Sequence, residues 1–96
     1  MFELTITDEG QIHLSGRLDA SQAEKAKKEL DKISHSSVVD FKDLDYISSA
    51  GLGVLFAAQK RLKDAGQGLK LINMNRHIRD VFRYARFDLI FEIEEL

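Results

Sequence analysis

The 96-residue chain contains no cysteine and no proline. The absence of cysteine excludes a disulfide framework, a thiolate zinc site and a cysteine nucleophile, and it fits a reducing compartment. No apolar run approaches the roughly 20 residues of a membrane span, and the N-terminus lacks the basic-then-apolar pattern of a signal peptide. We therefore expect a cytoplasmic protein that is neither exported nor inserted into a membrane.

The chain also has no large excess of acidic or basic residues. The formal net charge is −2, which gives no overall attraction to nucleic acid or anionic lipid. The chain is 44% hydrophobic and 31% charged, values typical of a globular protein, and a chain of this length has room for one core. We expect residues 1–96 to form a single domain.

The spacing of the apolar residues predicts the order of strands and helices. Alternation predicts a β-hairpin over residues 2–14, and spacings of three and four predict helices over 20–33, 49–65 and 78–85. Short apolar runs predict strands over 36–41, 69–72 and 87–93. Because helices separate the later strands, the sheet is expected to be at least partly parallel, with right-handed crossovers.

Residues 38–53 are the most informative segment for function. A predicted strand leads into an acidic loop and then into two serines, Ser48 and Ser49, at the start of a helix. Small residues follow at Ala50, Gly51 and Gly53 and would allow a phosphate or another backbone to approach. A helix N-terminus stabilises an anion, but a serine at this position is also a common N-cap, so both roles stay open.

Residues 43–53 resemble the signature of bacterial STAS-domain anti-sigma factor antagonists. The passages 14–19 and 81–87 resemble the strand-to-helix and helix-to-strand segments of the same family, so the similarity covers nearly the whole chain. The resemblance implies an α/β fold of the STAS type. Such a fold has a single small mixed sheet of four to five strands packed against about three helices.

In the family that the chain resembles, an anti-sigma kinase phosphorylates a serine at the start of this helix, and the matching position is Ser49. Many members carry an aspartate just before the target serine, where this chain has Ser48, so Ser48 is the second candidate. The unphosphorylated domain would bind the anti-sigma factor serine kinase, which carries the ATP, and would thereby regulate sigma-factor-dependent transcription. A serine phosphatase is a further candidate partner.

The resemblance also implies a contact face for the kinase at one edge of the sheet. Its expected residues are Asp19, Asp43, Asp45, Tyr46, Ile47, Ser48, Ala50, Gly51, Leu52 and Gly53. The alternative function is that of a STAS accessory or scaffold subunit that docks without phosphorylation, on a lipid ABC transporter or in a stress-signalling complex.

The residues do not assemble into a catalytic or metal-binding set. His13, His35 and His77 fall in a predicted strand, a turn and a helix start, and no serine–histidine pairing is suggested by their order. No P-loop lysine follows Gly53. The acidic residues lack companions at ligand spacing, which favours a solvated loop over a metal site; they are Asp40, Asp43 and Asp45. We expect no enzyme activity, no cofactor and no metal.

A basic face is predicted on the last helix. Its arginines follow one another at spacings of three, four and three; they are Arg76, Arg79, Arg83 and Arg86. No interleaved exposed aromatics and no nucleic-acid motif accompany them. A solvated face is one interpretation and an acidic protein partner is the other, and we expect no nucleic-acid binding.

Overall fold

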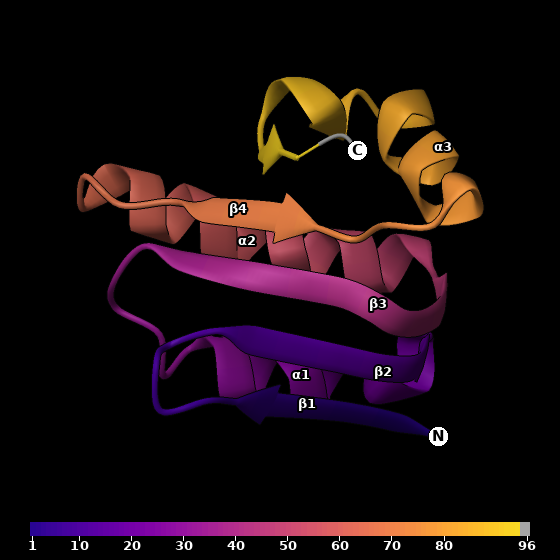
Figure 1. Cartoon of the computed structure of the whole chain (residues 1–96), viewed down its shortest axis with the longest axis horizontal. Coiled ribbons are helices and arrows are strands. Elements are labelled where there is room, and N and C mark those ends of the chain that lie inside the picture. The colour runs from indigo at the N-terminus through magenta and orange to yellow at the C-terminus, as the bar shows by residue number, and fades with distance from the viewer. Residues whose placement is uncertain (95–96) are drawn as a thin grey trace.

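The computed structural model describes residues 1–94, which form a five-stranded mixed sheet with helices (Figure 1). The strands lie in chain order in the sheet and are β1 (Phe2–Ile6), β2 (Ile12–Leu18), β3 (Ser37–Ile47), β4 (Leu69–Ile72) and β5 (Glu92–Ile93). The helices are α1 (Ala23–Leu30), α2 (Ser49–Asp64) and α3 (Arg76–Tyr84), with short 3₁₀ helices η1 (Ala20–Gln22) and η2 (Phe87–Leu89).

The order of the strands follows from their connections. β1 and β2 form the predicted hairpin, whose turn contains Gly10 at a φ of 83°, and they pair antiparallel. β2, β3, β4 and β5 pair parallel to one another through helical crossovers. α1 and α2 lie behind the strands in Figure 1 and so cover the same face of the sheet, whereas α3 lies beyond the end of β4. The predicted mixed α/β sheet is confirmed.

The hydrophobic core lies between the sheet and the helices. Phe82 of α3 is fully buried, and its ring makes edge contacts with Phe41 and Phe91 at centroid distances of 5.8 Å and with Phe87 at 6.2 Å. Such aromatic pairs combine apolar burial with favourable ring geometry. This cluster attaches α3 and η2 to β3.

No helix within residues 1–94 is long and apolar enough to cross a membrane.

β3 is longer than the sequence predicts. The expected acidic loop over residues 43–47 is a continuation of the strand, which stays paired with β2 as far as Leu18 and Ile47. Two register irregularities each place one extra residue in β3, between the partners of His13 and Ser15 and between those of Gly16 and Arg17. These bulges bury residues three apart, namely Phe41, Leu44 and Ile47. The alternation that marks a strand is therefore absent from this part of the sequence.

The expected strand over 87–93 is also corrected. Arg86 adopts a left-handed conformation with φ of 64°, and the chain then forms η2 before the two-residue β5. The apolar residues of this segment pack as a turn of helix because the aromatic cluster provides their contacts. α3 ends at Tyr84, so Arg86 does not share the helical face of the other arginines.

Gln59 of α2 links β4 and the chain after η2. Its side chain is only 2% exposed. Oε1 accepts a hydrogen bond from the Leu69 backbone N–H at 2.8 Å, and Nε2 donates to the Ile90 carbonyl at 2.9 Å. Both polar ends of the amide are therefore satisfied inside the fold.

We predict that Gln59→Ala lowers the free energy of unfolding by about 1–3 kcal/mol, because it leaves the buried Leu69 N–H without its partner. Urea denaturation of the purified chain would measure the change. Lys60→Ala, at the neighbouring exposed position, is the control and should change stability by less than about 0.5 kcal/mol. Equal stabilities of the two variants would contradict the structural role of Gln59.

Candidate functional site

The candidate site lies where β2 and β3 end side by side. Leu18 and Ile47 are register partners, and each strand then leads directly into a helix. The Ser48 backbone N–H donates a hydrogen bond to the Leu18 carbonyl at 2.9 Å. This bond holds the ends of β2 and β3 together. The start of η1 and the start of α2 are therefore neighbours at the right-hand end of β3 in Figure 1.

The two serines have different environments. Ser48 is half-buried and is the N-cap of α2: its Oγ accepts a hydrogen bond from the Gly51 N–H at 3.2 Å. Ser49 is the first residue of the helix and is exposed, and its hydroxyl has no hydrogen-bond partner within residues 1–94. Of the two serines considered as N-caps from the sequence, Ser48 has that role. Ser49 presents a free hydroxyl at the positive end of a 16-residue helix.

The small residues after the serines do not all face outward. A Cβ on Gly51 would lie 2.7 Å from Leu18 Cγ and 2.9 Å from both Ile47 Cγ1 and the Leu18 carbonyl oxygen. Gly51 therefore lets the first turn of α2 pack against the strand ends, and it is closed to a partner. Gly53 differs, since a Cβ there would meet nothing within 4 Å. Ala50 and Gly53 are exposed beside Ser49.

Burial divides the predicted contact residues into two groups. Ile47 is 4% exposed, Leu52 is 7% exposed and Gly51 is also buried, so these three present almost no surface. The other predicted residues are exposed or half-buried: Asp19, Asp43, Asp45, Tyr46, Ser48, Ala50 and Gly53. The first group supports the site from inside, and the second forms its surface.

Asp19, which was predicted to lie on the contact face, is the N-cap of η1. Its Oδ1 accepts hydrogen bonds from the Ser21 hydroxyl at 2.6 Å and from the Ser21 backbone N–H at 3.0 Å. The hydroxyl bond is the main cause that lowers the pKa of Asp19 below its ordinary value, so the carboxylate is charged at neutral pH. Its stabilising contribution is present above the unfolded-state pKa and is lost as the pH falls through the lowered folded-state pKa.

Three cross-strand contacts between β2 and β3 were not predicted. The Arg17 guanidinium lies over the Tyr46 ring at 4.3 Å from its centroid, in a cation–π contact between register partners. His13 Nε2 lies 2.9 Å from an Asp43 carboxylate oxygen, and His13 Nδ1 lies 3.7 Å from one of Asp40. These pairs depend on which residues face each other across two strands, and no local pattern reveals that register.

The acidic residues are therefore held on a strand and not in a solvated loop. Asp40 Oδ1 accepts hydrogen bonds from the Lys42 N–H and from Asn73 Nδ2, at 2.8 and 3.0 Å. Asp45 is exposed. Within residues 1–94 no three His, Cys, Asp or Glu side chains are placed to hold a metal ion.

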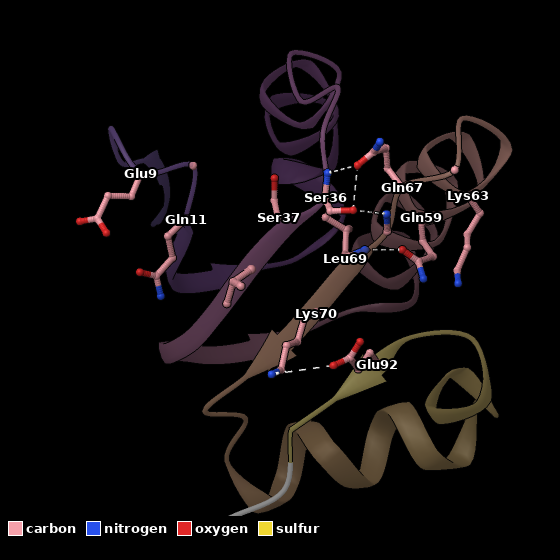
Figure 2. A pocket seen from close by; sticks show the side chains of 14 residues that line it. Glu9, Gln11, Ser36, Ser37, Gln59, Lys63, Gln67, Leu69, Lys70 and Glu92 are labelled. Atoms are coloured by element: carbon pink, nitrogen blue, oxygen red, sulfur yellow. Dashed lines mark hydrogen bonds and ion pairs between the residues drawn. The ribbon is translucent and has the colours of Figure 1, made fainter.

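A pocket of about 660 Å³ lies away from this site, where β3 and β4 begin (Figure 2). Its polar groups largely bond to one another: Ser36 Oγ donates to Gln67 Oε1 at 2.9 Å, and Lys70 pairs with Glu92 at 3.8 Å. None of the predicted site residues lines it. The candidate site is thus a surface feature and not a cavity.

Comparison with known proteins agrees with this fold. The family model described as "Mlab, STAS domain" matches residues 3–92, and the chain belongs to the STAS-domain family. BtrV of Bordetella bronchiseptica, provisionally named an anti-sigma factor antagonist, is 37% identical over 84 residues, which cover 83% of this chain and 72% of BtrV. The anti-sigma-B factor antagonist of Bacillus subtilis is 28% identical over 75 residues, 75% of this chain and 69% of that protein.

The fold is also that of a solved antagonist. The unphosphorylated form of the anti-sigma factor antagonist SpoIIAA matches with a TM-score of 0.72 at 16% identity, over 100% of this chain and 89% of SpoIIAA. Its phosphorylated form matches with a TM-score of 0.71 at 16% identity, over 99% of this chain and 92% of that one. The predicted STAS fold and the resemblance to anti-sigma factor antagonists are confirmed.

We predict that Gly51→Ala lowers the free energy of unfolding by about 1–3 kcal/mol, because its methyl group would overlap Leu18 and Ile47. Gly53→Ala, in the open, should be neutral or stabilising by up to about 1 kcal/mol, since alanine favours the helix. Denaturation curves of the two matched variants would test this. If Gly51→Ala were as stable as wild type, the close packing at the start of α2 would be refuted.

Proposed function

We propose that the chain is an anti-sigma factor antagonist that binds an anti-sigma factor serine kinase and is switched off by phosphorylation of Ser49. The observation that carries this proposal is the division between the two serines: Ser48 is engaged as a cap, and Ser49 is exposed with a free hydroxyl. The names of the relatives support the class of partner. The kinase supplies the ATP, and the chain itself acts without catalysis.

A phosphate on Ser49 would change the binding surface more than the fold. It adds roughly −1.5 to −2 charges at pH 7, and the N-terminal end of α2 stabilises an anion there. The predicted contact residues include the exposed Asp45 and the charged Asp19, and the small, exposed Ala50 and Gly53 would allow a partner to come close to Ser49. Added charge and bulk at this point would therefore oppose the kinase while α2 remains folded.

A second candidate function has support of its own. The matching family model is described by the name Mlab and not as a regulator of sigma factors. The chain would then be an accessory or scaffold subunit, of a lipid ABC transporter or a stress-signalling complex, that uses the same surface without phosphorylation. A permease and ATPase gene pair beside its gene would favour this function, whereas a neighbouring kinase-type ATPase gene would favour the first.

We predict that the kinase transfers one phosphate to the chain, on Ser49. Ser49→Ala should abolish phosphorylation and change stability by less than about 0.5 kcal/mol, because the hydroxyl makes no bond in the fold. Ser48→Ala should keep phosphorylation but lower the free energy of unfolding by about 0.5–2 kcal/mol, because the cap is lost. Phosphopeptide mapping and urea denaturation distinguish the two roles, and a phosphate found on Ser48 would refute the assignment.

We further predict that Ser49→Asp binds the kinase at least about tenfold more weakly than wild type, a loss of about 1.4 kcal/mol. Aspartate carries less charge than phosphoserine, so the phosphorylated chain should bind more weakly still. Calorimetric titration would measure both affinities, and circular dichroism melting should stay nearly unchanged. Undiminished binding by both forms would exclude the phosphorylation switch and favour the accessory-subunit function.

A further inference from the structure

An exposed stripe runs along α2 from the candidate site. Ser49, Gly53, Phe56 and Lys60 follow one another at spacings of four, three and four, which place them on one face of the helix, and all are exposed. Phe56 is 37% exposed and lies two helical turns beyond Ser49, roughly 10 Å along the helix axis. An aromatic ring thus stands on the same face as the free hydroxyl.

η2 packs against α2 at this ring. The rings of Phe56 and Phe87 stack with centroids 5.4 Å apart, and the Gln59 side chain donates to the Ile90 carbonyl just after η2. Leu89, in the same short helix as Phe87, is 76% exposed. A single exposed leucine is ordinary on a protein surface, but this one follows Phe87 by two residues in a segment that packs on the partly exposed Phe56.

Basic side chains accompany the apolar ones. Arg83 and Arg86 are exposed, and Arg86 immediately precedes η2, with its carbonyl accepting a hydrogen bond from the Leu89 N–H at 3.3 Å. Neither arginine forms an ion pair with any carboxylate within residues 1–94. Asp88 is an exposed acid of the same segment, so the arginines outnumber it. An apolar centre with a basic rim complements apolar side chains flanked by carboxylates.

We propose that Phe56, Phe87 and Leu89, with Arg83 and Arg86 at their side, form a second contact region for the anti-sigma factor kinase, here called the α2–η2 patch. The proposal rests on the proposed function and adds the chemistry of the partner: an acidic segment that carries apolar side chains. The stripe on α2 makes the patch continuous with Ser49. A kinase that phosphorylates Ser49 would contact both Ser49 and the patch, so their continuity favours a protein partner. An anionic membrane could bind the patch without any contact with the start of α2.

The patch would supply binding that does not depend on the state of Ser49. A phosphate acts at one end of the stripe, and the apolar contacts lie at the other. The kinase could therefore engage the patch first and then reach the Ser49 hydroxyl. Loss of the patch should weaken recognition of the substrate and leave the phosphoryl transfer itself unaffected.

The test is calorimetric titration of chain variants against the purified kinase that phosphorylates Ser49. Leu89→Ser should raise Kd at least about tenfold, because buried apolar anchors dominate interfaces. Arg83→Glu should raise Kd about fivefold or more and weaken its dependence on salt. Lys28→Glu, the same charge reversal on exposed α1, is the control and should leave Kd within about twofold. Leu89 is exposed, so the melting temperature of Leu89→Ser should equal that of wild type.

A kinetic measurement separates the patch from the phosphorylation site. In steady-state phosphorylation, Leu89→Ser should raise KM and leave kcat unchanged. If wild type binds the kinase and both Leu89→Ser and Phe56→Ser bind it with the same Kd as wild type, this inference is wrong and the proposed function stands. If wild type binds no kinase, both are wrong. Binding of wild type to phosphatidylserine vesicles that is lost in Arg83→Glu, with an unchanged Kd for the kinase, would overturn the inference in favour of a membrane.

Discussion

The close approach of Gly51 to Leu18 and Ile47 is the constraint on which the candidate site depends. Because no side chain intervenes, the first turn of α2 lies directly on the ends of β2 and β3. The same approach allows the Ser48 N–H to reach the Leu18 carbonyl. The connection from β2 to η1 and the connection from β3 to α2 are distant in sequence, and these contacts hold them side by side on one surface. A larger residue at Gly51 would separate the helix from the sheet and move Ser49 with it.

In the proposed function, this arrangement gives the adjacent serines separate roles, Ser48 in stability and Ser49 in signalling. Ser48 uses its hydroxyl inside the fold, where it satisfies one of the free N–H groups at the start of α2. Ser49 stands one position further along, and the helical rotation turns it into solvent. A modification of Ser49 can therefore change the surface without removing the cap. Because the helix N-terminus stabilises negative charge, we expect a chain phosphorylated at Ser49 to keep its fold.

The C-terminal part of the described chain contributes through aromatic packing. Phe82 joins α3 to Phe41 of β3, and Phe87 joins η2 to Phe56 of α2. These contacts place the segment after α3 against the helix that starts at Ser49. Helix α2 thus carries Ser49 of the candidate site and Phe56 of the α2–η2 patch. Different interactions fix its two parts: glycine packing at the first turn and the hydrogen bonds of Gln59 further along.

The sequence by itself determined the element order, the mixed α/β class and the helix start at Ser48 and Ser49, because hydrophobic spacing and capping are local properties. It also carried the STAS resemblance in residues 43–53. The tertiary structure decided the full length of β3, whose bulges bury Phe41, Leu44 and Ile47 and so remove the alternation of a strand. It likewise decided that Gly51 faces inward and that His13 meets Asp43, since both depend on packing and on register between distant strands.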